Sequence, residues 1–119
     1  MDKTFYITTP IYYPSAKPHM GHAYSSIIAD FLARFKRIDG FDVQFLTGTD
    51  EHGLKIQRSA EKQNIDPLEF CNQISQTFRD LSKTLNLTNT DFIRTTEDRH
   101  KKTVQHLWNE LEKNDDIYL

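Results

Sequence analysis

The stretch FYITTPIYYPSAKPHMGHAYSSIIADFLARF (residues 5–35) leads from a short strand, through a loop, into a long helix. The segment Phe5–Thr9 is aromatic and β-branched and stops at a proline, which is typical of a β-strand. Prolines at positions 10, 14 and 18 then make a stiff, irregular loop. A helix is predicted to begin near Met20 and to end around Asp39-Gly40. Its apolar residues recur at helical spacing: Tyr24, Ile27, Ile28, Phe31 and Phe35.

Strands and helices continue to alternate along the rest of the chain. Strands are predicted at Phe41–Leu46, a run that ends at Gly48, and at Asp91–Thr95. Three further helices are predicted. The first spans Leu54–Gln63, the second begins after the cap residue Asp66, and the third begins after the cap residue Thr96. This alternation predicts an α/β fold, with a parallel sheet covered by helices and joined by right-handed crossovers.

Apolar residues at helical spacing also mark the last two predicted helices. One helix should carry a buried stripe at steps of three and four: Cys71, Ile74, Phe78, Leu81 and Leu85. The other should turn an inner face toward the core: Val104, Leu107, Trp108 and Leu111.

The composition is that of an ordinary globular domain. The chain has 119 residues, 37% of them hydrophobic and 27% charged. A net charge of −2 does not favour a nucleic-acid binder held by bulk electrostatics. Cys71 is the only cysteine, which excludes a disulfide framework or a cysteine zinc site within the chain and fits a reducing compartment. No leader sequence and no apolar run of about 20 residues is visible, so we expect a soluble, cytoplasmic protein.

Two loops are candidates for chemistry, because ligands of such folds bind beyond the carboxyl ends of the strands. One is Pro10–His22 and the other is Thr47–Gly53, and neighbouring strands would place them side by side. In the first loop, His19 and His22 lie at a helix start, where phosphates bind and where donors can stabilise phosphoryl or nucleotidyl transfer. Gly21 would let a flat ring or a phosphate approach the backbone. The alternative is that both histidines are surface or capping residues.

The second loop carries a pair of carboxylates, Asp50 and Glu51. A buried acid here could hold a substrate ammonium, whereas the alternative is two solvated loop acids. Gly48 and Gly53 have the spacing of a phosphate-binding P-loop, but Leu54-Lys55 stands where lysine and serine or threonine are required. A dinucleotide-binding glycine fingerprint is also missing.

Three histidines, His19, His22 and His52, raise the question of a zinc triad. They lack the spacing of a zinc protease motif and have no outer carboxylate at a diagnostic position. We therefore expect no metal site.

Four segments together resemble the methionyl-tRNA synthetase family of the bacterial type, within the class I aminoacyl-tRNA synthetases: Thr8–Tyr13, Lys17–Tyr24, Phe45–Ile56 and Asp91–Lys102. The resemblance runs from about Phe5 to the last residue. The segment His19-Met20-Gly21-His22 is similar to the H-x-G-H signature of class I, with Met20 where isoleucine or leucine is usual. The matching motif residues are Pro10, Ile11, Tyr12, Tyr13, Pro18, His19, Met20, Gly21 and His22.

The resemblance implies a Rossmann-like nucleotide-binding fold with a parallel sheet, of which residues 1–119 are the N-terminal half, ending at the start of the connective insertion. It implies a methionine-tRNA ligase, which activates L-methionine with Mg-ATP to methionyl-adenylate and then charges tRNA(Met). Two alternatives are a non-catalytic remnant that binds ATP or methionine, and a small H-x-G-H nucleotidyltransferase.

The resemblance also implies roles for individual residues. His19 and His22 would be catalytic, contacting the ATP phosphates and stabilising the transition state. Tyr13 and Gly21 would complete the ATP site, with adenine against Gly21. Asp50 would bind the methionine ammonium, and the methionine pocket would be shaped in part by Ile11 and Tyr13.

Several parts of the family are missing from these 119 residues: the Lys-Met-Ser-Lys-Ser motif, the Cys-x-x-Cys zinc knuckle and the anticodon-binding domain. No zinc site is expected. We predict that the chain alone aminoacylates poorly or not at all. Apolar surfaces meant for the missing half should lower its stability and make it self-associate.

Overall fold

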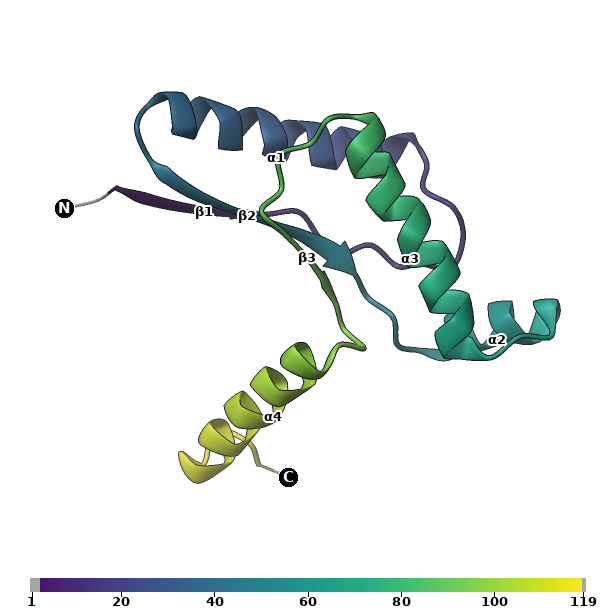
Figure 1. Ribbon diagram of the computed structural model, residues 1–119. Coiled ribbons are helices and arrows are strands. Elements are labelled where there is room, and N and C mark those ends of the chain that lie inside the picture. The colour runs from purple at the N-terminus through teal and green to yellow at the C-terminus, as the bar shows by residue number, and fades with distance from the viewer. Residues whose placement is uncertain (1–2, 119) are drawn as a thin grey trace.

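Figure 1 shows the computed structural model, which describes residues 3–118. Three parallel strands form one sheet in the order β1-β2-β3: β1 Thr4–Thr8, β2 Asp42–Thr49 and β3 Asp91–Arg94. Four helices follow or separate them: α1 Met20–Ile38, α2 Leu54–Gln63, α3 Pro67–Thr84 and α4 Asp98–Lys113. In the register, Phe5 lies opposite Val43 and Leu46 lies opposite Asp91. The predicted α/β fold with a parallel sheet is confirmed.

Helices α1 and α3 pack on the sheet through separate apolar clusters. Ala29 and Ala33 of α1 lie against Val43 and Phe45 of β2, and all four are buried. On α3, Phe78 packs with Phe92 of β3 and with Tyr12, and Cys71 packs with α2. The stripe predicted on α3 is confirmed, since Cys71 and Phe78 are buried while its other members, Ile74, Leu81 and Leu85, are half-buried.

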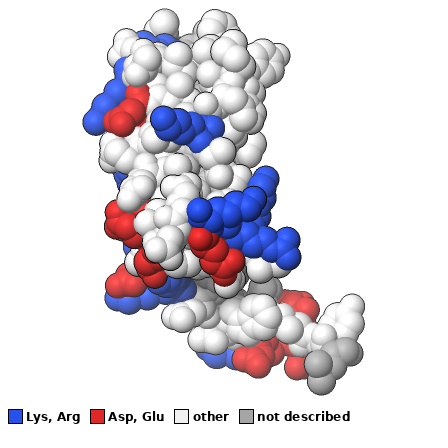
Figure 2. Space-filling model, turned by 90° about the vertical axis from the view of Figure 1, so that its right-hand side faces the viewer, with Lys and Arg blue, Asp and Glu red and all other residues white. Residues whose placement is uncertain are grey.

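The large apolar residues of α1 face away from the sheet. The residues that this helix buries are small or polar: Ala23, Ser26, Ala29, Asp30 and Ala33. The apolar residues that predicted the helix remain 44% to 69% exposed: Tyr24, Ile27, Ile28, Phe31 and Phe35. The upper part of Figure 2, where α1 lies, is mostly uncharged. This exposed face supports the predicted tendency to self-associate.

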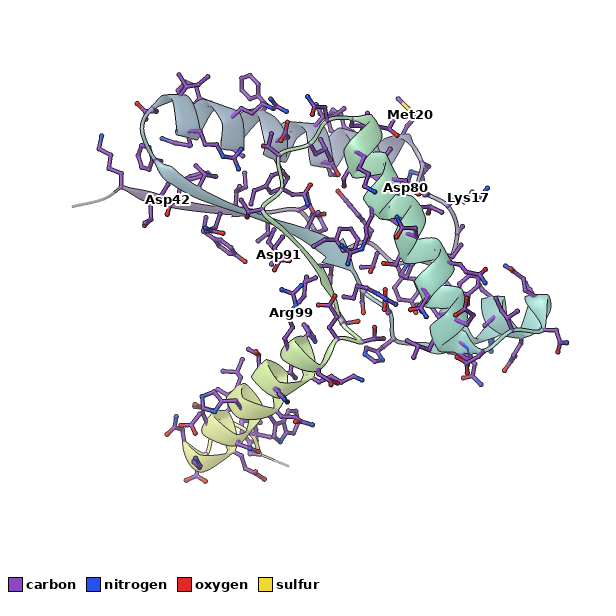
Figure 3. The ribbon with its side chains drawn as sticks, viewed as in Figure 1. Lys17, Met20, Asp42, Asp80, Asp91 and Arg99 are labelled. Atoms are coloured by element: carbon purple, nitrogen blue, oxygen red, sulfur yellow. The ribbon has the colours of Figure 1, made fainter. Side chains whose placement is uncertain are left out.

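The prediction of an inner face on the last helix was wrong. Helix α4 buries no residue. Its apolar residues are 36% to 58% exposed: Val104, Leu107, Trp108 and Leu111. Figure 1 shows the reason, because α4 extends away from the sheet and from the other three helices. It is anchored mainly at its first turn, where Arg99 bonds to Asp91 and to the carbonyl of Phe92 (Figure 3).

The helix caps explain two of the boundaries. The carboxylate of Asp66 accepts hydrogen bonds from the amides of Leu68 and Glu69, so the predicted cap of α3 is confirmed. The predicted cap of α4 was wrong, because the N-cap is Glu97 rather than Thr96. The hydroxyl of Thr96 instead donates to the buried carboxylate of Glu51, just after the end of β2.

Asp30 fastens α1 to the segment between α3 and β3. Its carboxylate accepts hydrogen bonds of 2.6 Å from the amide and the hydroxyl of Thr88 and from Nε of Arg34. Burial of Asp30 opposes ionisation, but the hydrogen bonds from Thr88 and Arg34 outweigh it and hold the pKa below its usual value.

Because its folded pKa is lowered, Asp30 stabilises the fold fully above its ordinary pKa of 3.8, and this contribution is lost as pH falls through the folded pKa. We expect Asp30→Asn to lower the free energy of unfolding at pH 7 by about 2 kcal/mol. Urea unfolding from pH 7 to pH 3 should show the difference from wild type shrinking at the acid end. The exposed Asp42→Asn is the control, and a difference for Asp30→Asn that is independent of pH would contradict this account.

Candidate active site

The two predicted loops lie side by side beyond the carboxyl ends of β1 and β2. The amide of Tyr12 donates to the carbonyl of Gly48 at 2.8 Å, and the amide of Asp50 donates to the carbonyl of Tyr12 at 2.9 Å. Tyr12 therefore bridges to Thr49 in parallel fashion, as a short continuation of the sheet. The predicted neighbourhood of the two loops is confirmed.

The two histidines cap α1 reciprocally. His19 is the N-cap, and its Nδ1 accepts a hydrogen bond of 3.1 Å from the amide of Gly21. The Nδ1 of His22 accepts one of 3.0 Å from the amide of His19, and the two rings lie 3.8 Å apart between centroids. Since both Nδ1 atoms accept, the proton of each neutral ring is on Nε2. Capping and ligand binding are therefore compatible, because capping leaves two Nε2–H donors at the positive end of a helix.

Gly21 leaves room for this cap. A Cβ at Gly21 would lie 2.9 Å from Cε1 of His19, so a side chain there would push the ring away from the amide that it accepts from. The glycine thus has a structural role in the H-x-G-H segment that sequence reasoning did not identify. Met20 is 84% exposed, so methionine in place of the usual isoleucine or leucine has little effect on packing among the described residues.

Aromatic side chains hold His22 in place. The ring centroids of Tyr12 and Phe78 lie 4.9 Å and 5.1 Å from that of His22. The hydroxyl of Tyr12 donates to the carbonyl of His22 and shares a 2.8 Å hydrogen bond with the hydroxyl of Ser26. Burial first, and the nearby charge of His19 second, lower the pKa of His22, so this ring is neutral at pH 7.

We expect histidine NMR spectra to report this state directly. His22 should titrate below its ordinary pKa of 6.5, and its ¹⁵N shifts should indicate the Nε2–H tautomer. Phe78→Leu, which removes part of the aromatic cover, should move the titration back toward 6.5. A wild-type midpoint above 6.5, or a proton on Nδ1, would contradict the geometry.

A cavity of about 340 Å³ opens beside the histidine pair. It is lined by Tyr13, Ser15, Ala16, Lys17, His19, His22 and Lys55. Three of the predicted site residues, Tyr13, His19 and His22, therefore share one cavity, whereas Gly21, Ile11 and Asp50 are not among its lining residues. Asp50 lies half-buried where the second loop begins, and Ile11 is 40% exposed on the first loop.

Tyr13 clasps the second loop. Its hydroxyl donates to the carbonyl of His52 at 2.8 Å. Gly53 has a φ of 116°, and a Cβ there would collide with the Tyr13 hydroxyl. The glycine is needed both for this backbone conformation and for the close approach of the ring. The clasp fixes the start of α2 relative to the first loop.

The two acids of the second loop have different environments, which corrects the interpretation of a solvated pair. The Glu51 side chain is fully buried, and its carboxylate accepts from Nε of Arg94 at 2.7 Å and from the hydroxyl of Thr49 at 2.8 Å. The guanidinium of Arg94 also donates to the amide oxygen of Asn72 on α3. Glu51 is therefore a structural residue that joins the end of β2 to β3, and only Asp50 is free for a ligand.

Other groups in this region are not arranged for chemistry. Burial raises the pKa of the Cys71 thiol to about 11, which makes it unreactive at neutral pH. His52 is bound to the carbonyl of Thr95 at 3.2 Å. In the part of the chain that the structure describes, no three His, Cys, Asp or Glu side chains are grouped to hold a metal ion. Among those same residues, no helix combines the length and the apolar character needed to cross a membrane.

Comparisons with known proteins show the family to which the chain is similar. The family described as tRNA synthetases class I (M) matches residues 5–119. The methionine–tRNA ligase of Rickettsia conorii is 55% identical over 118 residues, which are 99% of this chain and 23% of that protein. The methionine–tRNA ligase of Bacillus subtilis is 54% identical over 118 residues, covering 99% of this chain and 18% of that protein. The chain thus spans less than a quarter of the length of these curated relatives.

Solved structures show the same fold. The methionyl-tRNA synthetase of Mycobacterium tuberculosis bound by methionyl-adenylate matches with a TM-score of 0.95 and 44% identity, over 98% of this chain and 23% of that one. A leucyl-tRNA synthetase of Agrobacterium radiobacter matches in fold alone, with a TM-score of 0.83 and 24% identity over 98% of this chain and 15% of that one. The predicted Rossmann-like fold of class I synthetases is confirmed. The chain belongs to the methionyl-tRNA synthetase family of the class I tRNA synthetases.

Proposed function

We propose that this chain supplies the first half of the active site of a methionine-tRNA ligase. The reaction joins L-methionine to the α-phosphate of Mg-ATP, releases pyrophosphate and then charges tRNA(Met). The observation that carries the proposal is the pair of Nε2–H donors on His19 and His22 beside a shared cavity. In this proposal residues 1–119 are the N-terminal half of the catalytic domain, up to the connective insertion, and the enzyme works in the cytoplasm.

The histidines would act on the phosphates. A methionine carboxylate oxygen forms a bond to the α-phosphorus while the bond from that phosphorus to the bridging oxygen breaks. Negative charge grows on the departing pyrophosphate, and Nε2–H donors of His19 and His22 would stabilise it. Because His22 is held by Tyr12 and Phe78, its donor is oriented before the substrate arrives. Tyr13 would line the ATP site, and adenine would lie at Gly21.

The methionine would bind on the neighbouring loop. Asp50 would pair with the ammonium group, while Ile11 and Tyr13 would shape part of the pocket for the side chain. Support comes from the half-burial of Asp50, since a carboxylate in a partly desolvated position gains most from a cationic partner. Its backbone is fixed to the first loop through Tyr12, so the two ligands would share one edge of the sheet.

One alternative remains, a remnant that binds ATP or methionine without turnover, because membership of the synthetase family removes the small nucleotidyltransferase. Calorimetric titration with L-methionine and with Mg-ATP tests the binding that both possibilities require, and an assay of methionine-dependent ATP–pyrophosphate exchange tests turnover. We expect both ligands to bind, L-leucine not to bind, and exchange to be weak or absent in the 119 residues alone. Failure of both ligands to bind would overturn the proposal. Robust exchange would exclude the remnant and would overturn the prediction that the chain alone is inactive.

A further inference from the structure

Lys55 is an exposed cation at the start of a helix, where no acidic side chain offsets its charge. It lies in the first turn of α2, where a positive charge opposes the helix dipole, and that turn contains no acidic residue. No ion pair formed within residues 3–118 includes Lys55. Its ammonium nitrogen lies 5.9 Å from the ring centroid of Tyr13, a cation–π distance that holds the side chain near the first loop.

The surroundings of Lys55 suit a polyanion. Lys55 lines the same 340 Å³ cavity as His19 and His22, and none of the lining residues is a carboxylate. Lys55, in the first turn of α2, thus lines the same space as His19 and His22 at the start of α1. Lys17 also lines the cavity, but its side chain points outward from the loop in Figure 3. Of the two lining lysines, Lys55 is therefore the one that contacts an aromatic ring of the site.

We propose that Lys55 binds the β- or γ-phosphate of ATP, the part of the substrate that leaves as pyrophosphate. The inference rests on the proposed function and adds to it a phosphate-binding residue from the first turn of α2, directly after the second loop. The ammonium is a compact point charge, which can follow the terminal phosphates without a fixed bidentate geometry. The Tyr13 clasp on His52 and Gly53 sets where α2 begins, and so sets where this charge lies.

The test is a set of calorimetric titrations of the 119-residue chain with Mg-ATP, AMP, tripolyphosphate and L-methionine. We expect Lys55→Gln to weaken the binding of Mg-ATP and of tripolyphosphate about tenfold or more, and to leave AMP and L-methionine unchanged. Lys55→Arg should keep most of the affinity for Mg-ATP. The matched control is Lys62→Gln, an exposed lysine in the last turn of the same helix, which should behave like wild type.

The outcomes separate this inference from the proposed function. Unchanged affinity of Lys55→Gln for Mg-ATP, with L-methionine still bound, overturns the role of Lys55 alone. An equal loss of AMP binding also overturns it, because the effect would then come from altered structure rather than from the terminal phosphates. A wild-type chain that binds neither Mg-ATP nor L-methionine overturns the proposed function and this inference together.

Discussion

Glu51→Gln is expected to lower the free energy of unfolding by about 3 to 5 kcal/mol, the largest stability effect of any single change considered. The substitution keeps the shape of the side chain, removes its charge and replaces one acceptor oxygen by an amide donor. It leaves the guanidinium of Arg94, whose side chain is 19% exposed, without the anion that it pairs with at 2.7 Å. The same carboxylate accepts from the hydroxyls of Thr49 and Thr96, so its loss also weakens the junction of β2 with β3. Urea unfolding followed by circular dichroism gives the value.

Two further variants test whether the loss comes from the unpaired charge of Arg94. Asp50→Asn makes the same chemical change one residue earlier and should alter stability by no more than about 0.5 kcal/mol. The double variant Glu51→Gln with Arg94→Met should regain part of the loss, because the unpaired charge is then removed as well. An effect of Glu51→Gln no larger than that of Asp50→Asn would show that the ion pair does not hold the two strands together.

Asp50→Asn is expected to weaken the binding of L-methionine by about 30-fold to 1000-fold while the fold remains intact. The reason is the loss of the proposed ion pair with the substrate ammonium. A methionine analogue without the amino group, 4-(methylthio)butanoate, supplies the control ligand. The analogue should bind more weakly than L-methionine. Its affinity should be the same for wild type and Asp50→Asn, because neither protein can form the ion pair with it.

The comparison of the two ligands decides the role of Asp50. Equal losses for L-methionine and for the analogue would mean that Asp50 shapes the pocket rather than binding the ammonium. Unchanged affinity for L-methionine would remove Asp50 from the site. The two neighbouring acids are thus distinguished by their readouts, because Asp50 should govern ligand binding and Glu51 should govern stability.

Local sequence signals located the strands and helices well. The predicted helix Leu54–Gln63 has the bounds of α2, and the strand predicted at Phe5–Thr9 is β1, shifted by one residue. The second strand runs from Asp42 to Thr49, one residue past Gly48, where the predicted strand ends. Thr49 pairs with Tyr12 and with Arg94 of β3, and such long-range partners are not encoded in the strand's own residues.

Burial could be predicted less well, because it depends on what covers a face. Helical spacing identified apolar residues on α1 and α4, but spacing does not say whether the packing partner lies within the same 119 residues. On α1 the sheet side is made of alanines, such as Ala29 and Ala33, that allow close approach to β2. The large side chains, such as Phe31, lie on the opposite side.

The candidate site was likewise predicted in part. The motif His19 to His22 identified the donors, and the adjacent strands predicted that the second loop lies beside them. The residue pattern by itself could not separate Asp50 from Glu51, which only the family resemblance did, since the partner of Glu51 is Arg94, 43 residues further along. The signal for Lys55 was available, as a lysine in the first turn of a helix without an acidic residue, but it became informative only when the cavity was seen.

The central claim is that the imidazoles at the start of α1 and the aspartate after β2 serve one nucleotide and amino-acid site. NMR titration of the chain, with ¹⁵N-labelled histidine and labelled backbone amides, tests it most directly. We predict that Mg-ATP shifts the ring resonances of His19 and His22, and that L-methionine shifts the amides around Asp50 and Tyr13. Ligands that bind while these resonances stay in place, and shift others instead, would contradict the account.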